Sequence, residues 1–379
     1  MSSSNATEAV HGLFDPLAIR GVTLANRIVV SPMCQYSCEN GFATDWHLVH
    51  LGSRAAGGAG LVFAEATAVE ARGRISPYDQ GIWSDAHIEP LARITRFIHS
   101  QGSIAGIQLA HAGRKGSVGR PWEGGGKLEE NQGGWRDVVA PSAVSFAVNY
   151  AMPVALTTDG IATVVQAFGE AARRAHEAGY RVIEVHSAHG YLLHEFLSPL
   201  SNQRSDRYGG SFENRTRIVR ETMQAIRRQW PERYPLFIRI SATDWVEGGW
   251  DIAQSIELAR MLKPLGVDLV DCSSGGNVAD VKIPIGPGYQ TQFAEQVRHG
   301  AGILTGAVGM ITSPEQAEQI LRSGQADLIL MARQLLRDPY WPLHAASALE
   351  LATSWPPQYL RAAPRGMPAR KPADGTLFA

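Results

Sequence analysis

A repeated alternation of two kinds of segment constrains the fold of this chain more than any other feature. From residue 27 onward, short runs rich in β-branched and apolar residues alternate with longer segments whose apolar residues recur every three or four positions. Eight short runs are found, at residues 28–32, 60–66, 104–110, 182–186, 236–240, 269–273, 303–308 and 328–332. Alternation of this kind is typical of βα units around a parallel sheet, and eight units predict a single (β/α)8 TIM barrel.

The longer segments predict the outer helices of this barrel. They lie at residues 87–100, 159–178, 213–229, 252–265, 292–299 and 314–322. Glycine follows four of them, at Gly102, Gly179, Gly266 and Gly324, where the left-handed backbone that ends a helix favours a residue without a side chain.

Two stretches do not follow the alternation. Residues 112–156, after the third strand, are rich in Gly, Trp and Pro and too long for an ordinary βα loop, so we expect an excursion over the C-terminal face of the barrel. After Pro342, a last helix gives way to a Pro- and Arg-rich end. We therefore expect a flexible tail at residues 1–12, a barrel at residues 13–352 and a C-terminal arm at residues 353–379.

Charge and cysteine content exclude several classes of protein. Lys plus Arg number 35 and Asp plus Glu 36, a balance that argues against nucleic acid or an electrostatic membrane anchor as a partner. The longest unbroken runs of apolar residues are much shorter than the ~18 residues that span a bilayer, and the N-terminus does not resemble a signal peptide. Three scattered cysteines do not make a disulfide framework. We expect a soluble cytoplasmic protein that binds a small neutral or anionic molecule.

Arg239 lies in the fifth predicted strand between Ile238 and Ile240, and an arginine flanked in this way points into the barrel. A buried guanidinium needs an anion, since breaking a buried ion pair costs about 3–5 kcal/mol. Two explanations remain open from the residues alone. One is a structural ion pair with Glu65 or Glu184, and the other is a bound anionic cofactor.

The ends of the seventh and eighth predicted strands suggest a phosphate site. Gly309 follows the seventh strand, and Ala332 and Arg333 follow the eighth, where barrels often bind phosphate with backbone N–H groups and a basic side chain. A glycine at a strand end is also compatible with a simple tight turn. No G-x-G-x-x-G follows any strand, which argues against a nicotinamide cofactor bound in a Rossmann half.

The fourth strand leads into two histidines, a glycine and a tyrosine: His186, His189, Gly190 and Tyr191. They can converge if the strand ends near His186 and the chain turns at Gly190. Two interpretations compete. The histidines polarise a carbonyl while Tyr191 supplies a proton, or His186 and His189 bind a metal with His194 or Glu195, as in a metal-dependent hydrolase.

Six separated motifs in this order are similar to the Old Yellow Enzyme family, in its thermophilic-like class of xenobiotic reductases and NADPH dehydrogenases. They are Ser31-Pro-Met-Cys-Gln-Tyr36, Glu65-Ala-Thr67, Gln108-Leu-Ala-His-Ala-Gly-Arg114, His186-Ser-Ala-His-Gly-Tyr191, Asn202-Gln-Arg-Ser-Asp-Arg-Tyr-Gly-Gly-Ser211 and Arg333. The resemblance covers residues 13–361 and implies an FMN-dependent ene-reductase, which reduces C=C bonds activated by a carbonyl or nitro group with NADPH or NADH as hydride donor.

The resemblance also implies which residues bind the cofactor. Ser31, Pro32, Met33 and Cys34 would lie along the flavin, Ala66, Gln108 and His186 would contact the ring, Arg239 would meet its N1/C2 region, and Gly309, Ala332 and Arg333 would hold the phosphate. Many relatives have Gly where this chain has Ala332, a change that leaves the backbone N–H donor in place. Two roles stay open for Cys34: its sulfur tunes the potential of the flavin, or it is an ordinary small hydrophobic residue.

For the substrate, the resemblance implies that His186 and His189 stabilise a developing enolate-like oxygen and that Tyr191 protonates the α-carbon, with Tyr36 also in contact. The end of the chain resembles a segment that reaches a neighbouring subunit, so we expect a homodimer or larger assembly with Arg361 donated in trans. Two alternatives to the ene-reductase are kept: a metal-dependent hydrolase that uses His186, His189 and His194, and a non-catalytic flavin binder.

Overall fold

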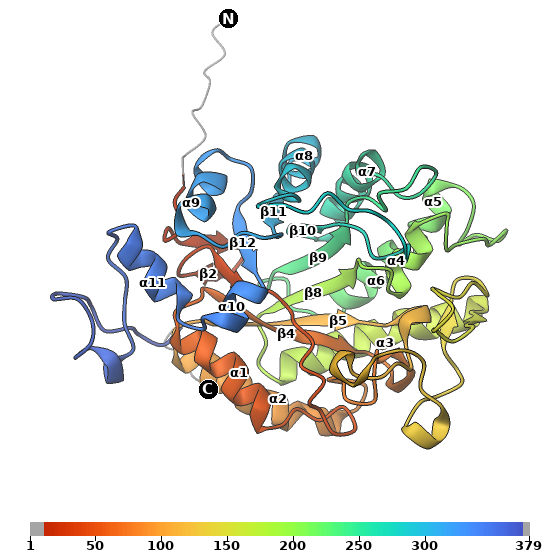
Figure 1. Cartoon of the computed structure of the whole chain (residues 1–379), viewed down its shortest axis with the longest axis horizontal. Helices are drawn as coiled ribbons and strands as arrows, with labels where there is room; N and C mark the ends of the chain where they lie inside the picture. The colour runs from red at the N-terminus through yellow and green to blue at the C-terminus, as the bar shows by residue number, and fades with distance from the viewer. Residues whose placement is uncertain (1–10, 374–379) are drawn as a thin grey trace, which may run out of the picture.

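Eight parallel strands close into a barrel in the computed structural model, which describes residues 11–373 (Figure 1). The strands are β3 (Ile28–Val30), β4 (Leu61–Ala68), β5 (Ile104–Ala110), β8 (Val182–Ser187), β9 (Leu236–Ser241), β10 (Leu269–Ser273), β11 (Leu304–Ala307) and β12 (Leu328–Met331). Hydrogen bonds join them in chain order, and β12 pairs with β3 to close the ring. Each predicted strand overlaps one of these, which confirms the (β/α)8 barrel.

The helices surround this barrel. They are α1 (Asp45–Ala56), α2 (Ile88–Ser100), α3 (Thr158–Glu177), α4 (Leu192–Leu197), α5 (Phe212–Arg215), α6 (Arg217–Arg227), α7 (Ile252–Leu262), α8 (Thr291–Ala301), α9 (Pro314–Arg322), α10 (Arg333–Arg337) and α11 (Trp341–Ala348). The four glycines expected after helices all have positive φ.

Three helical predictions need correction. The segment predicted as one helix at 213–229 is two helices, α5 and α6. Helix α7 ends at Leu262 rather than 265, because Pro264 lacks the N–H that would continue it. Helix α1 was not predicted, and its buried face explains why: His47, His50 and Arg54 lie there beside Leu51, so the apolar period is broken.

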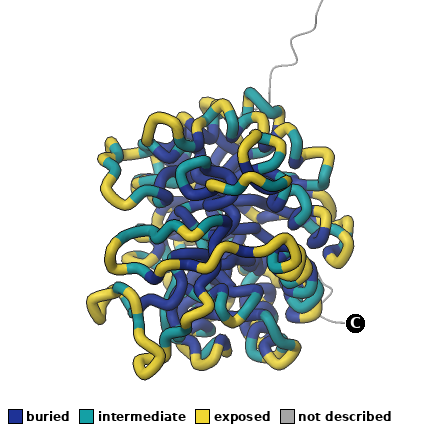
Figure 2. Tube along the Cα trace, turned by 90° about the vertical axis from the view of Figure 1, so that its right-hand side faces the viewer, coloured by how far each residue is buried: buried dark blue, intermediate teal, exposed yellow. Residues whose placement is uncertain are grey.

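The hydrophobic core has two parts. Figure 2 shows the buried residues in dark blue at the centre of the molecule. The larger part lies between the strands and the helices. The smaller part fills the N-terminal end of the barrel, where Phe63 and Phe237 pack at 6.2 Å between ring centroids. The N-terminal hairpin of β1 (Leu17–Ile19) and β2 (Val22–Leu24) covers this end with Ile19, Val22 and Leu24. The opposite end of the barrel is therefore the one left for polar groups.

The excursion after β5 contains short elements only: the 3-10 turns η3 (Gly113–Lys115), η4 (Pro121–Glu123) and η5 (Glu130–Gln132), and the paired strands β6 (Val139–Ala140) and β7 (Val154–Ala155). Its Lys115 bonds to the backbone carbonyl of His189, which follows β8. The segment thus crosses the C-terminal end of the barrel, as predicted.

The C-terminal arm is a closed loop that projects from the barrel near α11 (Figure 1). Trp355 N–H donates to Pro368 O at 3.0 Å, and Arg370 N–H donates to Trp355 O at 2.7 Å. The Arg370 guanidinium donates to Ala55 O and Ala56 O at 2.9 and 3.0 Å, at the C-terminal end of α1, where the Gly58 N–H also donates to Ala55 O. Between these fixed ends lie the turn η7 (Pro357–Tyr359) and Arg361, all exposed.

The expected flexible tail and the last part of the expected arm fall largely on residues 1–10 and 374–379, outside the described residues. Within residues 11–373, no helix is both long and apolar enough to cross a membrane.

Candidate active site

A cavity of about 390 Å³ opens at the C-terminal end of the barrel. The predicted cofactor and substrate residues that line it are Ser31, Pro32, His189, Arg239, Gly309, Ala332 and Arg333. They lie within or just after strands β3, β8, β9, β11 and β12, which are distant in sequence. The βα topology alone brings these residues together, because the C-terminal ends of all eight strands meet at one face.

Arg239 is 5% exposed and has three partners across the barrel. Its Nε bonds to Asp271 and lies 3.7 Å from Glu184 Oε1, and its Nη2 donates to Ser31 Oγ at 2.8 Å. The expected ion pair is therefore present with Glu184 and with Asp271, a partner that was not predicted. Since Arg239 also lines the cavity, the two explanations of its burial do not exclude each other.

Two carboxyl groups thus share one guanidinium in the barrel interior. Burial raises the pKa of Glu184 to about 8 and also raises the pKa of Asp271, while Arg239 opposes both shifts. Gln108 donates from Nε2 to Glu184 Oε1 at 2.7 Å, which places this predicted ring contact in the same network. The sequence pattern that indicated an inward-pointing Arg239 is present at Asp271 too. Asp271 is a single charged residue between the apolar residues Val270 and Cys272 of a strand.

Glu65 does not pair with Arg239. Its carboxylate accepts Gln35 N–H at 3.0 Å and lies 3.1 Å from His47 Nε2, which is also 3.3 Å from Cys38 Sγ. The three side chains resemble a metal site in composition. However, Thr44 N–H donates to Nδ1 of His47 at 3.0 Å, so the proton of a neutral ring is on Nε2 and no lone pair remains there for a metal.

His186, His189 and Tyr191 form a compact cluster beside the cavity. The two imidazole rings are perpendicular with centroids 5.1 Å apart, and the Tyr191 ring lies 4.9 Å from the His186 ring. The chain turns at Gly190, with φ of +71°, and Tyr191 then precedes α4. This turn returns Tyr191 to the strand end, as the pattern of residues required.

The hydrogen bonds of the histidines fix their chemistry. Ala188 N–H donates to Nδ1 of His186 at 3.3 Å, which leaves Nε2–H of a neutral ring as a free donor. His189 Nε2 lies 2.6 Å from Ser273 Oγ. Burial lowers the pKa of both histidines well below the usual value, and Arg239 adds to the shift, so both rings are neutral near pH 7. Burial raises the pKa of Tyr191, which keeps its hydroxyl protonated.

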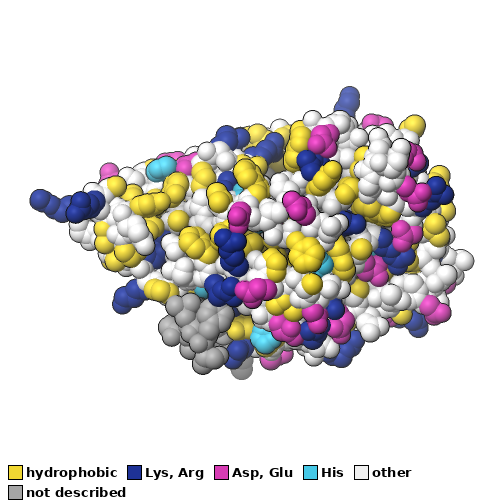
Figure 3. Space-filling model, turned by 90° about the horizontal axis from the view of Figure 1, so that it is seen from below, with side chains coloured by type: hydrophobic (Ala, Val, Ile, Leu, Met, Phe, Trp, Pro, Cys, Tyr) yellow, Lys and Arg dark blue, Asp and Glu magenta, His cyan; other side chains and the backbone are white. Residues whose placement is uncertain are grey.

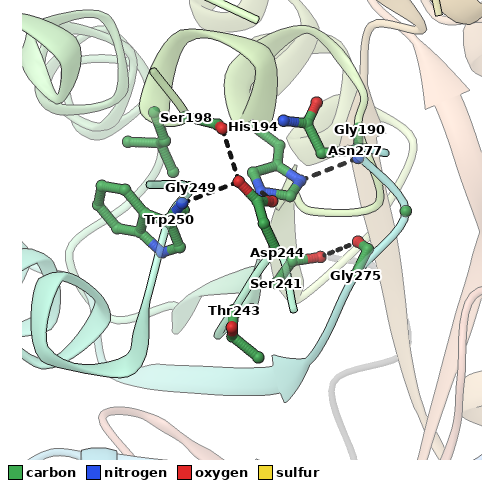
Figure 4. A network of polar contacts seen from close by, with 12 residues as sticks. Gly190, His194, Ser198, Ser241, Thr243, Asp244, Gly249, Trp250, Gly275 and Asn277 are labelled. Carbon is green, nitrogen blue, oxygen red and sulfur yellow. Dashed lines mark hydrogen bonds and ion pairs between the residues drawn. The ribbon is translucent and has the colours of Figure 1, made fainter. Parts of the chain in front are cut away.

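His194 and Glu195 do not join this cluster as metal ligands. Gly190 N–H donates to Nδ1 of His194 at 2.9 Å, so Nε2 carries the proton that faces Asp244 Oδ1 at 3.0 Å (Figure 4). Ser198 also donates to Asp244, at 2.6 Å. Glu195 Oε1 accepts the backbone N–H of Arg114 at 2.9 Å. Both side chains support the turn after β8, which argues against the hydrolase alternative.

Cys34 and Tyr36 lie in a small apolar cluster with Tyr191 and with Tyr150 of the excursion, packed on Ile75, Ala112 and Val118. Burial raises the pKa of the Cys34 thiol well above its usual value, so the sulfur is protonated. Ala66 lies with Tyr191 in a small adjoining cavity, and Met33 packs on the main core. Tyr150 was not predicted, because the excursion has no periodic pattern that would orient its side chains.

Two further residues need comment. Lys115 bonds to the carbonyls of His189 and Gly276 and was not predicted, although it directly follows the motif that ends at Arg114. Arg361 lies on the exposed arm and does not line the cavity of its own chain.

Comparisons with known proteins agree with this geometry. Residues 12–352 match the model of the NADH:flavin oxidoreductase / NADH oxidase family. The chain is 50% identical over 354 residues to an NADPH dehydrogenase of Halalkalibacterium halodurans, covering 93% of this chain and 99% of that protein. It is 49% identical over 352 residues to an NADPH dehydrogenase of Bacillus subtilis, covering 92% and 98%.

Solved structures of similar fold include morphinone reductase, with a TM-score of 0.76, 27% identity and 93% of each chain covered. An old yellow enzyme homologue from Zymomonas mobilis has a TM-score of 0.75 and 26% identity, with 93% of this chain and 99% of that chain covered. With the barrel, the polar C-terminal end and these matches, the chain belongs to the NADH:flavin oxidoreductase / NADH oxidase family and is an FMN-dependent oxidoreductase of Old Yellow Enzyme type.

Proposed function

We propose that this chain is an ene-reductase that reduces C=C bonds activated by a carbonyl or nitro group, with NADPH or NADH as hydride donor. Relatives that are NADPH dehydrogenases support the nicotinamide donor. When bound, FMN supplies the hydride transfer, in a ping-pong cycle of two half-reactions at one site. The observation that carries the proposal is the cluster of two neutral histidines and one protonated tyrosine beside the cavity.

The three side chains have complementary roles in this proposal. His186 Nε2–H donates to the carbonyl or nitro oxygen of the substrate. His189 is the second donor, and we assign its proton to Nδ1, with Nε2 as the acceptor of the Ser273 hydroxyl 2.6 Å away. Such donors stabilise the negative charge that grows on this oxygen, and each contributes about 2.7–4 kcal/mol. Tyr191 gives its proton to the α-carbon, and Tyr36 contacts the substrate.

The residues at the cavity fit FMN. A phosphate suits the end near Arg333, Ala332 and Gly309, where a Cβ on Gly309 would approach Gln290 Nε2 to 2.9 Å. The Arg239 guanidinium suits the N1/C2 edge of the flavin, on which negative charge collects during reduction. The remaining proposed contacts are Ser31, Pro32, Met33, Cys34, Ala66, Gln108 and His186.

A spectrum distinguishes the ene-reductase from the two alternatives. The purified protein should be yellow, lose its colour with NADPH and regain it when cyclohexenone is added. A yellow protein that NADPH does not bleach would indicate a non-catalytic flavin binder. A colourless protein with stoichiometric zinc would indicate the hydrolase.

Two variants test the catalytic roles. His186→Ala should impair alkene reduction by about 100-fold or more while FMN stays bound, because it removes a donor to the developing oxyanion. Tyr191→Phe should lower the rate of reduction only for those alkenes that need a proton from the enzyme. Tyr180→Phe, at a tyrosine buried in the core, is the matched control and should leave the rates unchanged. Loss of FMN from both site variants would show that these residues hold the cofactor instead.

The arm supports a proposal about assembly. We propose a barrel at residues 13–352, an arm at 353–379 and a cytoplasmic location. We also propose a homodimer in which Arg361 of one subunit enters the active site of the other. Tyr359 and Leu360 of the arm are exposed. Trp46 and Val49 of α1 are exposed too. Figure 3 shows one face of the molecule on which hydrophobic side chains lie among charged ones.

Truncation after Trp355 tests this proposal. It should raise KM for the alkene or convert the assembly to a smaller one in solution, because Arg361 is lost with the arm. A chain that ends at residue 373, which keeps the closed loop, is the control. Unchanged kinetics and unchanged mass after the longer truncation would contradict the trans arrangement.

A further inference from the structure

Two βα loops of the candidate site approach each other through their backbones. Gly190, in the loop after β8, has so little space that a Cβ there would overlap Gly276 O, in the loop after β10. A Cβ on Gly276 would in turn lie 2.7 Å from His189 Cα. Because of this contact, the orientation of His189 and Tyr191 depends on how the two loops are held together.

The carbonyl oxygens of His189 and Gly276 converge on one point between these loops, and Lys115 occupies it. The Lys115 ammonium donates to His189 O at 2.7 Å and to Gly276 O. It also lies 4.0 Å from the centroid of the Phe146 ring, which belongs to the excursion. Two converging carbonyl dipoles repel each other, and the Lys115 side-chain nitrogen holds them together because it donates to both oxygens. Burial lowers the pKa of Lys115 to about 7, and both its protonated and its neutral form carry N–H donors.

His189 itself indicates that the loop is held under constraint. Its φ of +59° is in the left-handed region, which a side chain with a Cβ rarely adopts. Lys115 bonds to the carbonyl of this residue, and Ser241 Oγ accepts its N–H at 2.9 Å. The Tyr191 ring lies 5.6 Å from the same ammonium.

We propose that Lys115 is a positioning residue that holds the loop after β8 against the loop after β10. It thereby orients His189 to stabilise the charge that develops on the substrate and Tyr191 to donate a proton. This inference rests on the proposed ene-reductase function for its kinetic part only. The neighbouring Arg114 holds the β10 loop separately, through Asn277 O at 2.7 Å, so removal of the Lys115 ammonium alone leaves this second tie in place.

Lys115→Met tests the proposal, because methionine keeps most of the aliphatic stem and loses all donors. With FMN bound, the amides of residues 188–192 and 275–277 should exchange with deuterium at least about 10-fold faster than in the natural protein, since the loops open more often. Lys115→Arg, which retains donors and charge, should restore most of the protection. Lys127→Met, at a half-exposed lysine of the same excursion, is the control and should change neither loop.

The kinetic part uses the rate at saturating alkene. Lys115→Met should lower it by up to about 100-fold with FMN content unchanged, the size expected when a reacting group shifts by about 1 Å. Combined with Tyr191→Phe, it should lower the rate by less than the product of the two single effects, because both changes act through one hydroxyl. Multiplicative effects would contradict action through Tyr191.

The outcomes separate this inference from the proposed function. Unchanged exchange in Lys115→Met would overturn the proposed role of Lys115, even if the natural protein reduces alkenes. If the natural protein reduces no activated alkene, the proposed function fails, while faster exchange in Lys115→Met would still support that role.

Discussion

The two ends of the barrel interior share the same strands but differ in chemistry. Phe237 and Arg239 lie on the same face of β9, Leu269 and Asp271 on the same face of β10, because alternate residues of a strand share a face. The lower residue of each pair belongs to the apolar core at the N-terminal end, and the upper one to the buried ionic network. A step of two residues along each strand therefore separates the part that stabilises the barrel from the part that lies beside the cavity.

Phe63→Ala should have the largest effect on stability, since it removes a buried ring from the apolar end. Phe63 is 1% exposed and packs on Phe237, and loss of such a ring costs about 3–5 kcal/mol of unfolding free energy. Urea denaturation measures the difference. Val49→Ala, at a residue 66% exposed on α1, is the control with an expected change below about 0.5 kcal/mol. An equally small loss for Phe63→Ala would mean that this end does not carry the stability of the barrel.

At the polar end, the effect of substitution should depend on the protonation of a neighbour. Asp271→Asn alone should be tolerated well, because it removes one cause of the raised pKa of Glu184, which can then ionise and pair with Arg239. The double variant Glu184→Gln with Asp271→Asn leaves Arg239 unpaired and should cost about 3 kcal/mol of unfolding free energy. Additive small losses in a double-mutant cycle would show that Arg239 does not need either carboxylate.

Glu195 should give the polar end a pH dependence that the apolar end lacks. Burial raises its pKa to about 8, so the folded chain keeps a proton that the unfolded chain releases above about pH 4.5. Its contribution to stability is present below pH 4.5 and is lost as the pH rises towards 8. As the pH rises from 5 to 8, the free energy of unfolding of Glu195→Gln should therefore gain about 1–3 kcal/mol relative to that of the natural chain. Chemical denaturation at several pH values measures this, with the exposed Glu247→Gln as a control that shows no trend.

Arg370→Ala should have the smallest effect, because the arm packs outside both cores. The variant loses donors to Ala55 O, Ala56 O and Ser354 O, which water can partly replace, so we expect a loss of about 1 kcal/mol. Limited proteolysis within residues 356–367 should become faster. Arg365→Ala, on the exposed part of the same loop, should leave the cleavage rate unchanged. Equal cleavage of both variants would mean that Arg370 does not hold the loop closed.

The local pattern of the sequence predicted most of the barrel, because strands and helices differ in the period of their apolar residues. Helix α1 was missed where that period fails, at the buried polar residues His47, His50 and Arg54. The break between α5 and α6 at Thr216 was missed because neither Pro nor Gly stands there to mark a helix end.

The site shows a similar division. Residues in recognisable motifs, such as His186 and Tyr191, could be proposed from the sequence, whereas their partners depend on contacts between distant strands. Asp271 meets Arg239 through the register of β9 with β10, and Lys115 meets Gly276 across 161 positions. The residues around Asp271 indicate that it points into the barrel, but nothing in the sequence indicates which residue Asp271 or Lys115 contacts. Hydrogen bonds to Nδ1 of His47 and His194, which exclude metal binding at these rings, are likewise visible only in three dimensions.

The closed form of the C-terminal arm has a consequence for association. A free tail loses the conformational entropy of every residue that becomes ordered when it docks, at a cost of about 1–2 kcal/mol per residue. In this chain the bonds of Trp355 and Arg370 have already fixed both ends of the loop, so the residues between them have fewer conformations to lose. The arm is therefore preorganised, and a surface that receives Tyr359 and Arg361 would need fewer contacts to hold them than it would for a disordered end.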